Sequence, residues 1–130
     1  MPRVLLVEDS YNMRAFVKSA LESEGSELGD VQVAEASSGF DALRLLPRGP
    51  YDLVITDINM PDINGLELLQ FIRKSEQHKD TPVLLISTGS SERERERGLS
   101  LGANGYLPKP FAPDQLRKEA ARLMGQELPE

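Results

Sequence analysis

Cysteine is missing from this chain of 130 residues, and so are long hydrophobic runs. Without cysteine there can be no disulfide scaffold, no thiolate metal site and no cysteine nucleophile. No apolar stretch approaches the roughly 18 residues that a membrane-spanning helix requires, so membrane insertion is not expected. Residues 1–3 lead directly into a short apolar run and show no signal peptide. The sequence therefore predicts a soluble, cytoplasmic protein.

Positively charged residues are in the minority. The chain has 15 lysine and arginine residues and 21 aspartate and glutamate residues, for a formal net charge of −6. Because phosphate-backbone binding needs a clustered positive surface, this balance argues against a nucleic-acid partner. It suits a partner that brings a cation or a basic face. The length and the lack of repeats or linkers predict one domain over residues 1–130.

Short apolar runs alternate with helical patterns along the chain. The runs predicted to be strands lie at residues 3–7, 31–34, 53–56, 82–87 and 106–107. The helical pattern that follows each run is expected to begin near Ser10, Ser37 or Ser38, Leu66, Ser91 and Pro113. Continuously apolar strands that alternate with helices indicate a parallel sheet covered on both faces. The predicted fold is a three-layer α/β/α sandwich with right-handed crossovers.

The stretch from Tyr51 to Gly65 is the most informative, because its apolar strand ends in the carboxylate of Asp57. Parallel strands place their C-terminal ends on one edge of the sheet, where open α/β folds carry their chemistry. Other predicted strands also lead into polar residues at this edge: Glu8 and Asp9 after the first, Ser87 and Thr88 at the fourth, and Lys109 after the fifth. The sequence thus predicts three carboxylates, a hydroxyl and an ammonium at one rim.

This combination of groups suits phosphoryl transfer. Three carboxylates at short range repel one another, and a divalent cation such as Mg²⁺ removes that cost while favouring a phosphate ligand. Lys109 can pair with one phosphate oxygen and Ser87 can donate to another. A carboxylate can itself act as a nucleophile and become an acyl phosphate.

Each residue also has an ordinary interpretation. Asp57 alone is more often a turn residue or helix cap, and the acidic pair after the first strand could merely enrich a helix N-terminus in negative charge. The hydroxyls after the fourth strand could belong to a turn, and Lys109 could be a solvated loop lysine. Only the joint placement at four strand ends favours chemistry.

Four further features are predicted outside this rim. His78, the only histidine, is expected at the surface after the third helix. The alternating Glu-Arg run at 92–97 is expected to form a solvated, ion-paired helix face, with partner binding as the alternative. Ser91 and Glu94 have the spacing of a capping box. Tyr106 is either an ordinary strand aromatic or a switch residue.

Several motifs occur together in a fixed order. They are Val-Glu-Asp-Ser at 7–10, Asp-Ile-Asn-Met-Pro at 57–61 with Gly65, Pro82 to Thr88, Gly102-Ala103, and Lys-Pro-Phe at 109–111. Together they resemble the receiver domain of bacterial two-component response regulators, over essentially the whole chain. The resemblance implies a five-stranded, flavodoxin-like sheet of order 2-1-3-4-5, the strand order known from chemotaxis receivers.

The resemblance also implies a role for each residue at the rim. Asp57 is similar to the phosphoacceptor, Ser87 to the switch hydroxyl and Lys109 to the lysine that contacts the phosphoryl group, with a cis bond to Pro110. Tyr106 is similar to the switch aromatic. The implied Mg²⁺ ligands are Glu8, Asp9, Asp57 and the backbone carbonyl of Asn59.

The implied partners are a sensor histidine kinase and an output protein, bound at the face of the fourth helix, fifth strand and fifth helix. The protein would be a signalling switch and not an enzyme acting on a separate substrate, without an organic cofactor, and a monomer or weak dimer. Two departures from the family pattern are Ser87 in place of the commoner Thr, and Thr88 in place of Ala or Gly. The bulk of Thr88 could restrict access to Asp57.

The type of receiver has several possible readings. If this is the whole gene product, no output domain is expected after the fifth helix. The motif Glu8-Asp9-Ser10 followed by Met13-Arg14, together with Asn59, resembles stand-alone chemotaxis (CheY-like) receivers, which indicates a role in chemotaxis or motility. A receiver cut from a larger regulator and a phosphate sink are alternatives. An aspartyl-phosphate hydrolase of the haloacid dehalogenase type is disfavoured, because Asn59 stands where its acid/base aspartate would be. A flavodoxin-like cofactor binder would need a phosphate loop after the first strand, which is missing.

Overall fold

Strands and helices alternate along the part of the chain that the computed structural model describes, residues 2–23, 28–89 and 92–125. In chain order the elements are β1 (Arg3–Val7), α1 (Tyr11–Leu21), β2 (Gln32–Ala36), α2 (Gly39–Leu45) with a 3₁₀ turn (Leu46–Arg48), β3 (Leu53–Asp57), α3 (Gly65–Lys74), β4 (Val83–Ser87), α4 (Glu92–Ser100), β5 (Gly105–Pro108) and α5 (Pro113–Leu123).

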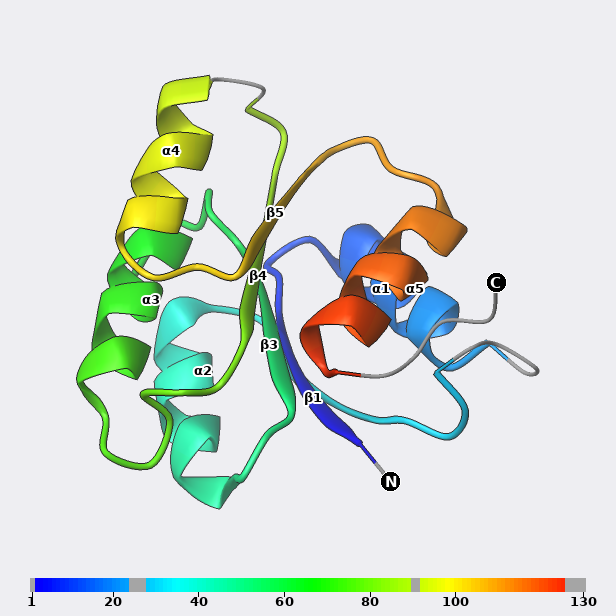
Figure 1. Cartoon of the computed structure of the whole chain (residues 1–130), viewed down its shortest axis with the longest axis horizontal. Helices are drawn as coiled ribbons and strands as arrows, with labels where there is room; N and C mark the ends of the chain where they lie inside the picture. The colour runs from blue at the N-terminus through cyan, green and yellow to red at the C-terminus, as the bar shows by residue number, and fades with distance from the viewer. Residues whose placement is uncertain (1, 24–27, 90–91, 126–130) are drawn as a thin grey trace.

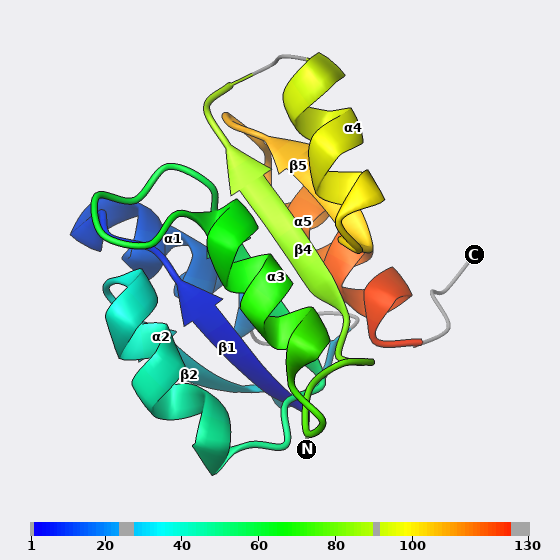
Figure 2. The ribbon, with the colours of Figure 1, turned by 90° about the vertical axis from the view of Figure 1, so that its left-hand side faces the viewer.

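The five strands form one parallel sheet of order β2-β1-β3-β4-β5. Helices α2, α3 and α4 cover one face, and α1 and α5 cover the other (Figure 1). Figure 2 looks onto the first of these faces, with the three helices in front of the sheet. The predicted three-layer α/β/α fold and its strand order are confirmed.

Alternation along the strands divides the buried side chains between two hydrophobic cores. Val4 and Leu6 of β1 point to the core that contains Val17 of α1 and Leu116 of α5. Their neighbours Leu5 and Val7 belong to the core under α2 and α3. Because successive strand residues face opposite sides, a strand buried on both faces is apolar along most of its length.

Polar caps fix where the helices begin. Ser10 Oγ accepts a hydrogen bond from Met13 N, as predicted, and the choice between two serines falls on Ser38, whose Oγ accepts from Asp41 N. The Asn64 side chain caps α3. The capping box predicted for α4 falls on Ser91, which lies outside the described residues.

The surface position predicted for His78 is wrong. Its imidazole is only 2% exposed, and Nε2 lies 2.7 Å from the Leu46 carbonyl oxygen. Gly49 makes room for the ring, because a Cβ there would lie 2.7 Å from His78 Cε1. The ring also packs near Tyr51, with centroids 6.0 Å apart. These contacts join segments about thirty positions apart, and no local periodicity signals them.

Candidate functional site

The residues predicted to form the site come together at the C-terminal edge of the sheet. Glu8 directly follows β1, Asp57 ends β3, Ser87 ends β4, and Lys109 follows β5. The side chains of Glu8, Asp57 and Ser87 are buried, whereas Asp9 is exposed. One carboxylate oxygen from each of Glu8, Asp9 and Asp57 lies within 4.8 Å of the others. The rim therefore carries three converging oxygen donors.

Lys109 bridges two of these carboxylates. Its Nζ lies 2.9 Å from Glu8 Oε1 and 3.3 Å from Asp57 Oδ2, and its side chain is 10% exposed. The Lys109 backbone N–H donates to the Ser87 carbonyl, which fixes the segment after β5, and the bond to Pro110 is cis, as the resemblance implied. The ammonium offsets part of the buried negative charge.

The pKa values at the rim reflect this burial. Burial raises the pKa of the Glu8 carboxyl, and the hydrogen bonds from Ser10 N–H and from Lys109 only partly oppose that effect. Burial works against the charged form of Lys109, but its bond to Glu8 and the charge of Asp57 raise its pKa overall. One ammonium faces the two buried carboxylates of Glu8 and Asp57, so the rim attracts further positive charge.

A tight loop after β3 holds Asp57 in place. The Gly65 N–H donates to the Ile58 carbonyl at 2.9 Å. A Cβ at Gly65 would overlap the Asp57 carbonyl oxygen, so the close approach requires glycine. The Asn59 N–H donates to Asp57 Oδ1 at 3.2 Å and orients the carboxylate.

These residues fit a hard divalent cation. Mg²⁺ is bound by one or two carboxylates and keeps several waters, and the donors at this rim are carboxylate oxygens. The converging oxygens of Glu8, Asp9 and Asp57 are the residues that could hold it. The backbone carbonyl of Asn59 as a further ligand stays a prediction, as does the restriction of access by Thr88, which is exposed beside Ser87.

A second hydrogen-bonded group lies beside the carboxylates. Ser87 Oγ donates to Glu94 Oε1 at 2.7 Å and accepts from Asn59 Nδ2 at 3.3 Å and from Gly89 N at 3.0 Å. Tyr106 OH donates to the Gly89 carbonyl and lies 2.9 Å from the same Glu94 Oε1. Burial, followed by the bond to Glu94, raises the pKa of the Tyr106 hydroxyl. The site thus connects to α4 through Glu94.

Glu94 was missed as a site residue by sequence reasoning. It was assigned to a capping box and a solvated helix face, because it sits in a run where acidic and basic residues alternate. The ion pair between Glu92 and Arg95, at 3.1 Å, agrees with that assignment for the outer side of the helix. The signal that could have found it is its place in the first turn after the strand of Ser87.

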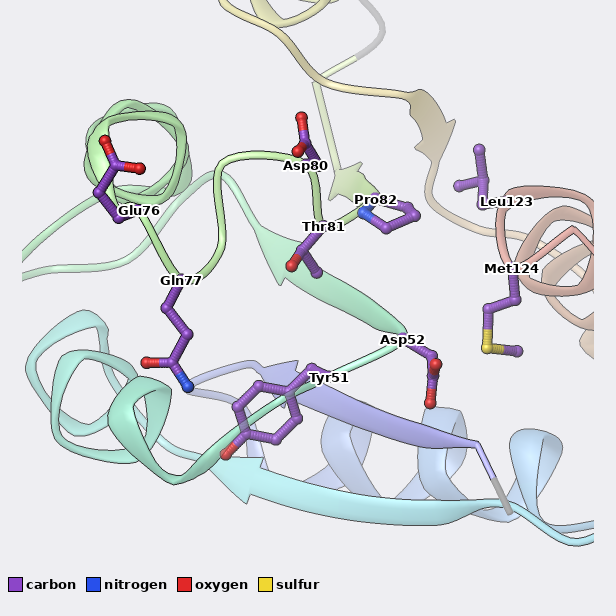
Figure 3. Close-up of a pocket in the computed structure, with 9 residues that line it drawn as sticks. All are labelled: Tyr51, Asp52, Glu76, Gln77, Asp80, Thr81, Pro82, Leu123 and Met124. Carbon is purple, nitrogen blue, oxygen red and sulfur yellow. The ribbon is translucent and has the colours of Figure 1, made fainter.

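A surface pocket of about 360 Å³ lies at the other end of the sheet (Figure 3). Tyr51 and Asp52 precede β3, and Thr81 and Pro82 precede β4, so this pocket lies at the N-terminal ends of the strands. None of the predicted site residues lines it. The predicted site residues and this pocket therefore lie at opposite ends of the sheet.

Comparison with known proteins identifies the family. Residues 4–121 match the family described as the response regulator receiver domain. The chain belongs to this family. The receiver is 35% identical over 124 residues to a chemotaxis protein CheY homolog of Campylobacter jejuni, which covers 95% of this chain and 92% of that protein.

Solved structures agree with this assignment. The receiver matches chemotaxis protein CheY4 of Vibrio cholerae with a TM-score of 0.85 at 35% identity, over 95% of this chain and 98% of that one. The receiver domain of a sensor histidine kinase from Pseudomonas aeruginosa, with a magnesium ion coordinated in its active site cleft, gives a TM-score of 0.84 at 28% identity. That match covers 96% of this chain and 98% of the other.

These matches make the chain a CheY-like response regulator receiver, as the motifs predicted. Among the helices of the described residues, none is both long and apolar enough to cross a membrane.

Proposed function

We propose that this receiver is a Mg²⁺-dependent signalling switch in which Asp57 accepts a phosphoryl group from a sensor histidine kinase. In the transfer, an Asp57 carboxylate oxygen bonds to phosphorus as the bond from phosphorus to a nitrogen of the kinase histidine breaks. The observation that carries the proposal is the convergence of Glu8, Asp9 and Lys109 on Asp57 at one strand-end rim.

Glu8, Asp9 and Asp57, with the proposed Asn59 carbonyl, would hold the ion. Bound Mg²⁺ neutralises charge on the phosphoryl oxygens. The magnesium ion in the Pseudomonas aeruginosa relative supports this ligand class for the present chain. The three converging carboxylate oxygens, with one ammonium beside them, are the chain's own reason to bind a cation.

The other residues of the rim would bind the phosphoryl group and respond to it. Lys109 would donate to one phosphoryl oxygen and Ser87 to another, and the change at Ser87 would reach Tyr106. The face of α4, β5 and α5 would then bind an output protein. The CheY relatives favour chemotaxis or motility as the process. Thr88 would limit how fast small phosphodonors reach Asp57.

The proposal is tested by adding Mg²⁺ with beryllofluoride, an acyl phosphate analogue, or with acetyl phosphate, to the wild-type protein and to Asp57→Asn. We expect NMR shifts at Tyr106 and along α4 in the wild-type protein only. Asp30→Asn is the matched control, because Asp30 is an exposed aspartate outside the rim. An equal response from Asp57→Asn, or none from the wild-type protein, would refute the proposal.

A second experiment addresses the output. A pull-down that compares the beryllofluoride-bound protein with Asp57→Asn should recover a partner only with the former. A phosphate sink would instead receive phosphoryl groups without gaining a partner. The Pseudomonas aeruginosa match is the receiver domain of a sensor histidine kinase. It supports the alternative that this receiver is part of a larger regulator.

A further inference from the structure

The proton of the Ser87 hydroxyl is already committed in this structure. A serine hydroxyl has one hydrogen to donate, and here it points to Glu94 Oε1 at 2.7 Å. The other two contacts of Ser87 Oγ, from Asn59 Nδ2 and Gly89 N, bring hydrogens to the oxygen and so use its lone pairs. Ser87 therefore cannot donate to a group on Asp57 until its bond to Glu94 breaks.

The acceptor of this proton is a strong one. Hydrogen bonds accepted by an ionised carboxylate are stronger than bonds between neutral groups, and the 2.7 Å separation is a well-formed O–H···O distance. Ser87 is fully buried and Glu94 is half-buried in the first turn of α4, so water competes poorly for this bond. Glu94 also packs against the Gly89 backbone, where a Cβ would lie 2.9 Å from Oε1.

The same carboxylate oxygen serves Tyr106. Its hydroxyl has one hydrogen and two acceptors in reach, Glu94 Oε1 at 2.9 Å and the Gly89 carbonyl. Glu94 Oε1 of α4 thus connects the Ser87 hydroxyl at the site to Tyr106 of β5. The other acidic residues at the start of α4 point elsewhere: Glu92 pairs with Arg95, and Glu96 is exposed.

We infer that Glu94 is a positioning residue that holds Ser87 and Tyr106 in the unphosphorylated arrangement and so opposes phosphorylation of Asp57. The inference rests on the proposed function. An arriving phosphoryl oxygen competes with Glu94 Oε1 for the Ser87 proton. When Ser87 leaves, Glu94 Oε1 loses the Ser87 proton, so the surroundings of the Tyr106 hydroxyl, 2.9 Å from the same oxygen, change in the same step.

The test measures beryllofluoride affinity at saturating Mg²⁺. In Glu94→Ala the Ser87 proton lacks its carboxylate acceptor in the unphosphorylated form, so we expect about tenfold tighter beryllofluoride binding, with the affinity for Mg²⁺ alone unchanged. Glu94→Gln keeps a neutral acceptor of the same shape and should fall between. Glu96→Ala, on the exposed side of the same helix, should match the wild-type protein.

A gain in affinity separates this role from simple structural damage, which would weaken binding. In a Ser87→Ala background, Glu94→Ala should add nothing, because the contact to be released is already absent. Equal beryllofluoride affinity of Glu94→Ala and the wild-type protein would overturn the inference. So would a gain that persists in the Ser87→Ala background.

A second measurement does not depend on the phosphoryl analogue. Because Glu94 contributes to the raised pKa of Tyr106, Glu94→Gln should lower the pKa of Tyr106 in an NMR titration, and an unchanged pKa would count against the inference. If the wild-type protein failed to bind beryllofluoride with Mg²⁺, the proposed function itself would fall, together with the role of Glu94 in it. That result is distinguishable from equal binding by both proteins, which overturns the Glu94 inference alone.

Discussion

At the scale of single residues, the three carboxylates of the rim outnumber its one ammonium, that of Lys109. Lys109 contacts both Glu8 and Asp57, and its side chain is almost fully enclosed. Removing one partner of a buried ion pair leaves the other charge uncompensated, at a typical cost of several kcal/mol. The same excess of negative charge is what a divalent cation would bind, so stability and metal binding are linked at this position.

Replacing Lys109 tests this link. Without Mg²⁺, Lys109→Ala should lower the free energy of unfolding by about 3 kcal/mol, since two buried carboxylates lose their ammonium. Mg²⁺ should still bind, because the oxygen donors remain, and should recover part of the loss. Beryllofluoride should no longer shift Tyr106. Urea unfolding with and without Mg²⁺, calorimetry and NMR measure the three effects.

Lys118→Ala, which removes an exposed lysine of α5, is the control for the loss of positive charge. A normal Tyr106 response in Lys109→Ala would contradict the role proposed for Lys109 in coupling. A large loss of Mg²⁺ affinity would show that the lysine organises the ligands and does not merely balance their charge.

The site could be predicted from the sequence to the extent that strand ends determine it. Asp57, Ser87 and Lys109 were found because parallel strands bring their C-terminal ends to one edge, whatever the details of packing. Glu94 and His78 were assigned to the surface. Their partners lie on other elements, and the contacts depend on how a helix or a turn rotates against the sheet, which residue patterns do not specify.

At the scale of elements, α4 is attached to the sheet differently from its neighbour α3. Gly98 is the buried residue of α4, and a Cβ there would lie 2.5 Å from Leu85 Cδ1, so the helix backbone comes close to β4. Helix α3 instead buries Leu68, Leu69 and Ile72. Side-chain burial supplies most of the stability of a helix in a protein, so α4 has the weaker attachment.

Amide hydrogen exchange should show this difference. We expect the amides of α4 to exchange through local openings of lower free energy than those of α3, because an opening of α4 exposes less apolar surface. NMR exchange rates at one pH, converted to opening free energies, give the comparison. Equal protection in the two helices would contradict the argument from burial.

Asp62 fixes the start of α2 from the loop after β3. Its carboxylate accepts hydrogen bonds from Phe40 N at 2.9 Å and from Gly39 N at 3.2 Å. The bond from Phe40, the largest influence, holds the pKa of Asp62 below its usual value. For a carboxyl whose pKa is lowered by folding, the stabilisation is present above the unfolded pKa, ordinarily about 3.9. It is lost as the pH falls through the folded value.

The prediction concerns Asp62→Asn. This variant should be less stable than the wild-type protein at pH 7. The difference should start to shrink near about pH 3.9, where the carboxyl becomes protonated in the unfolded chain, and should vanish below the lowered pKa of the folded protein. Urea unfolding at both pH values measures it. Asp30→Asn, which changes an exposed aspartate, should show no such pH-dependent difference. A difference between Asp62→Asn and the wild-type protein that stays constant with pH would exclude an ionised Asp62 as its source.

The order of elements followed from the alternation of apolar runs with helical patterns, but their ends did not. Strand β2 was predicted at 31–34 and is found at Gln32–Ala36. Its residues are partly exposed because it lies at the edge of the sheet, so the apolar signal used to place the buried strands is weak there. Pairing with β1 sets its bounds, and pairing is a property of the folded sheet.

At the scale of the whole molecule, one sheet separates two cores. Ile55 belongs to the core under α1 and α5, and Ile72 to the core under α2 and α3. The two cores share backbone but are formed by different sets of side chains. Stability changes at distant sites without shared partners usually add within roughly 0.5 kcal/mol.

We therefore expect the double variant Ile55→Val with Ile72→Val to lose the sum of the single losses. Each single change should cost about 1 kcal/mol. Urea unfolding of the four proteins in the cycle gives the interaction free energy. A coupling well above 0.5 kcal/mol would mean that the sheet transmits packing changes from one face to the other.

The buried position of His78 determines how a phosphorylation signal can be assigned to this chain or to a kinase. The chain has one histidine, and its imidazole is 2% exposed with Nε2 already against the Leu46 carbonyl. While the fold is intact, that ring is shielded from a phosphodonor and from imidazole-directed reagents. In a mixture with a histidine kinase, any phosphoramidate signal therefore belongs to the kinase, and any acyl phosphate that depends on Asp57 belongs to this chain. The two steps of the proposed relay can thus be followed in one reaction mixture by the chemistry of the label alone.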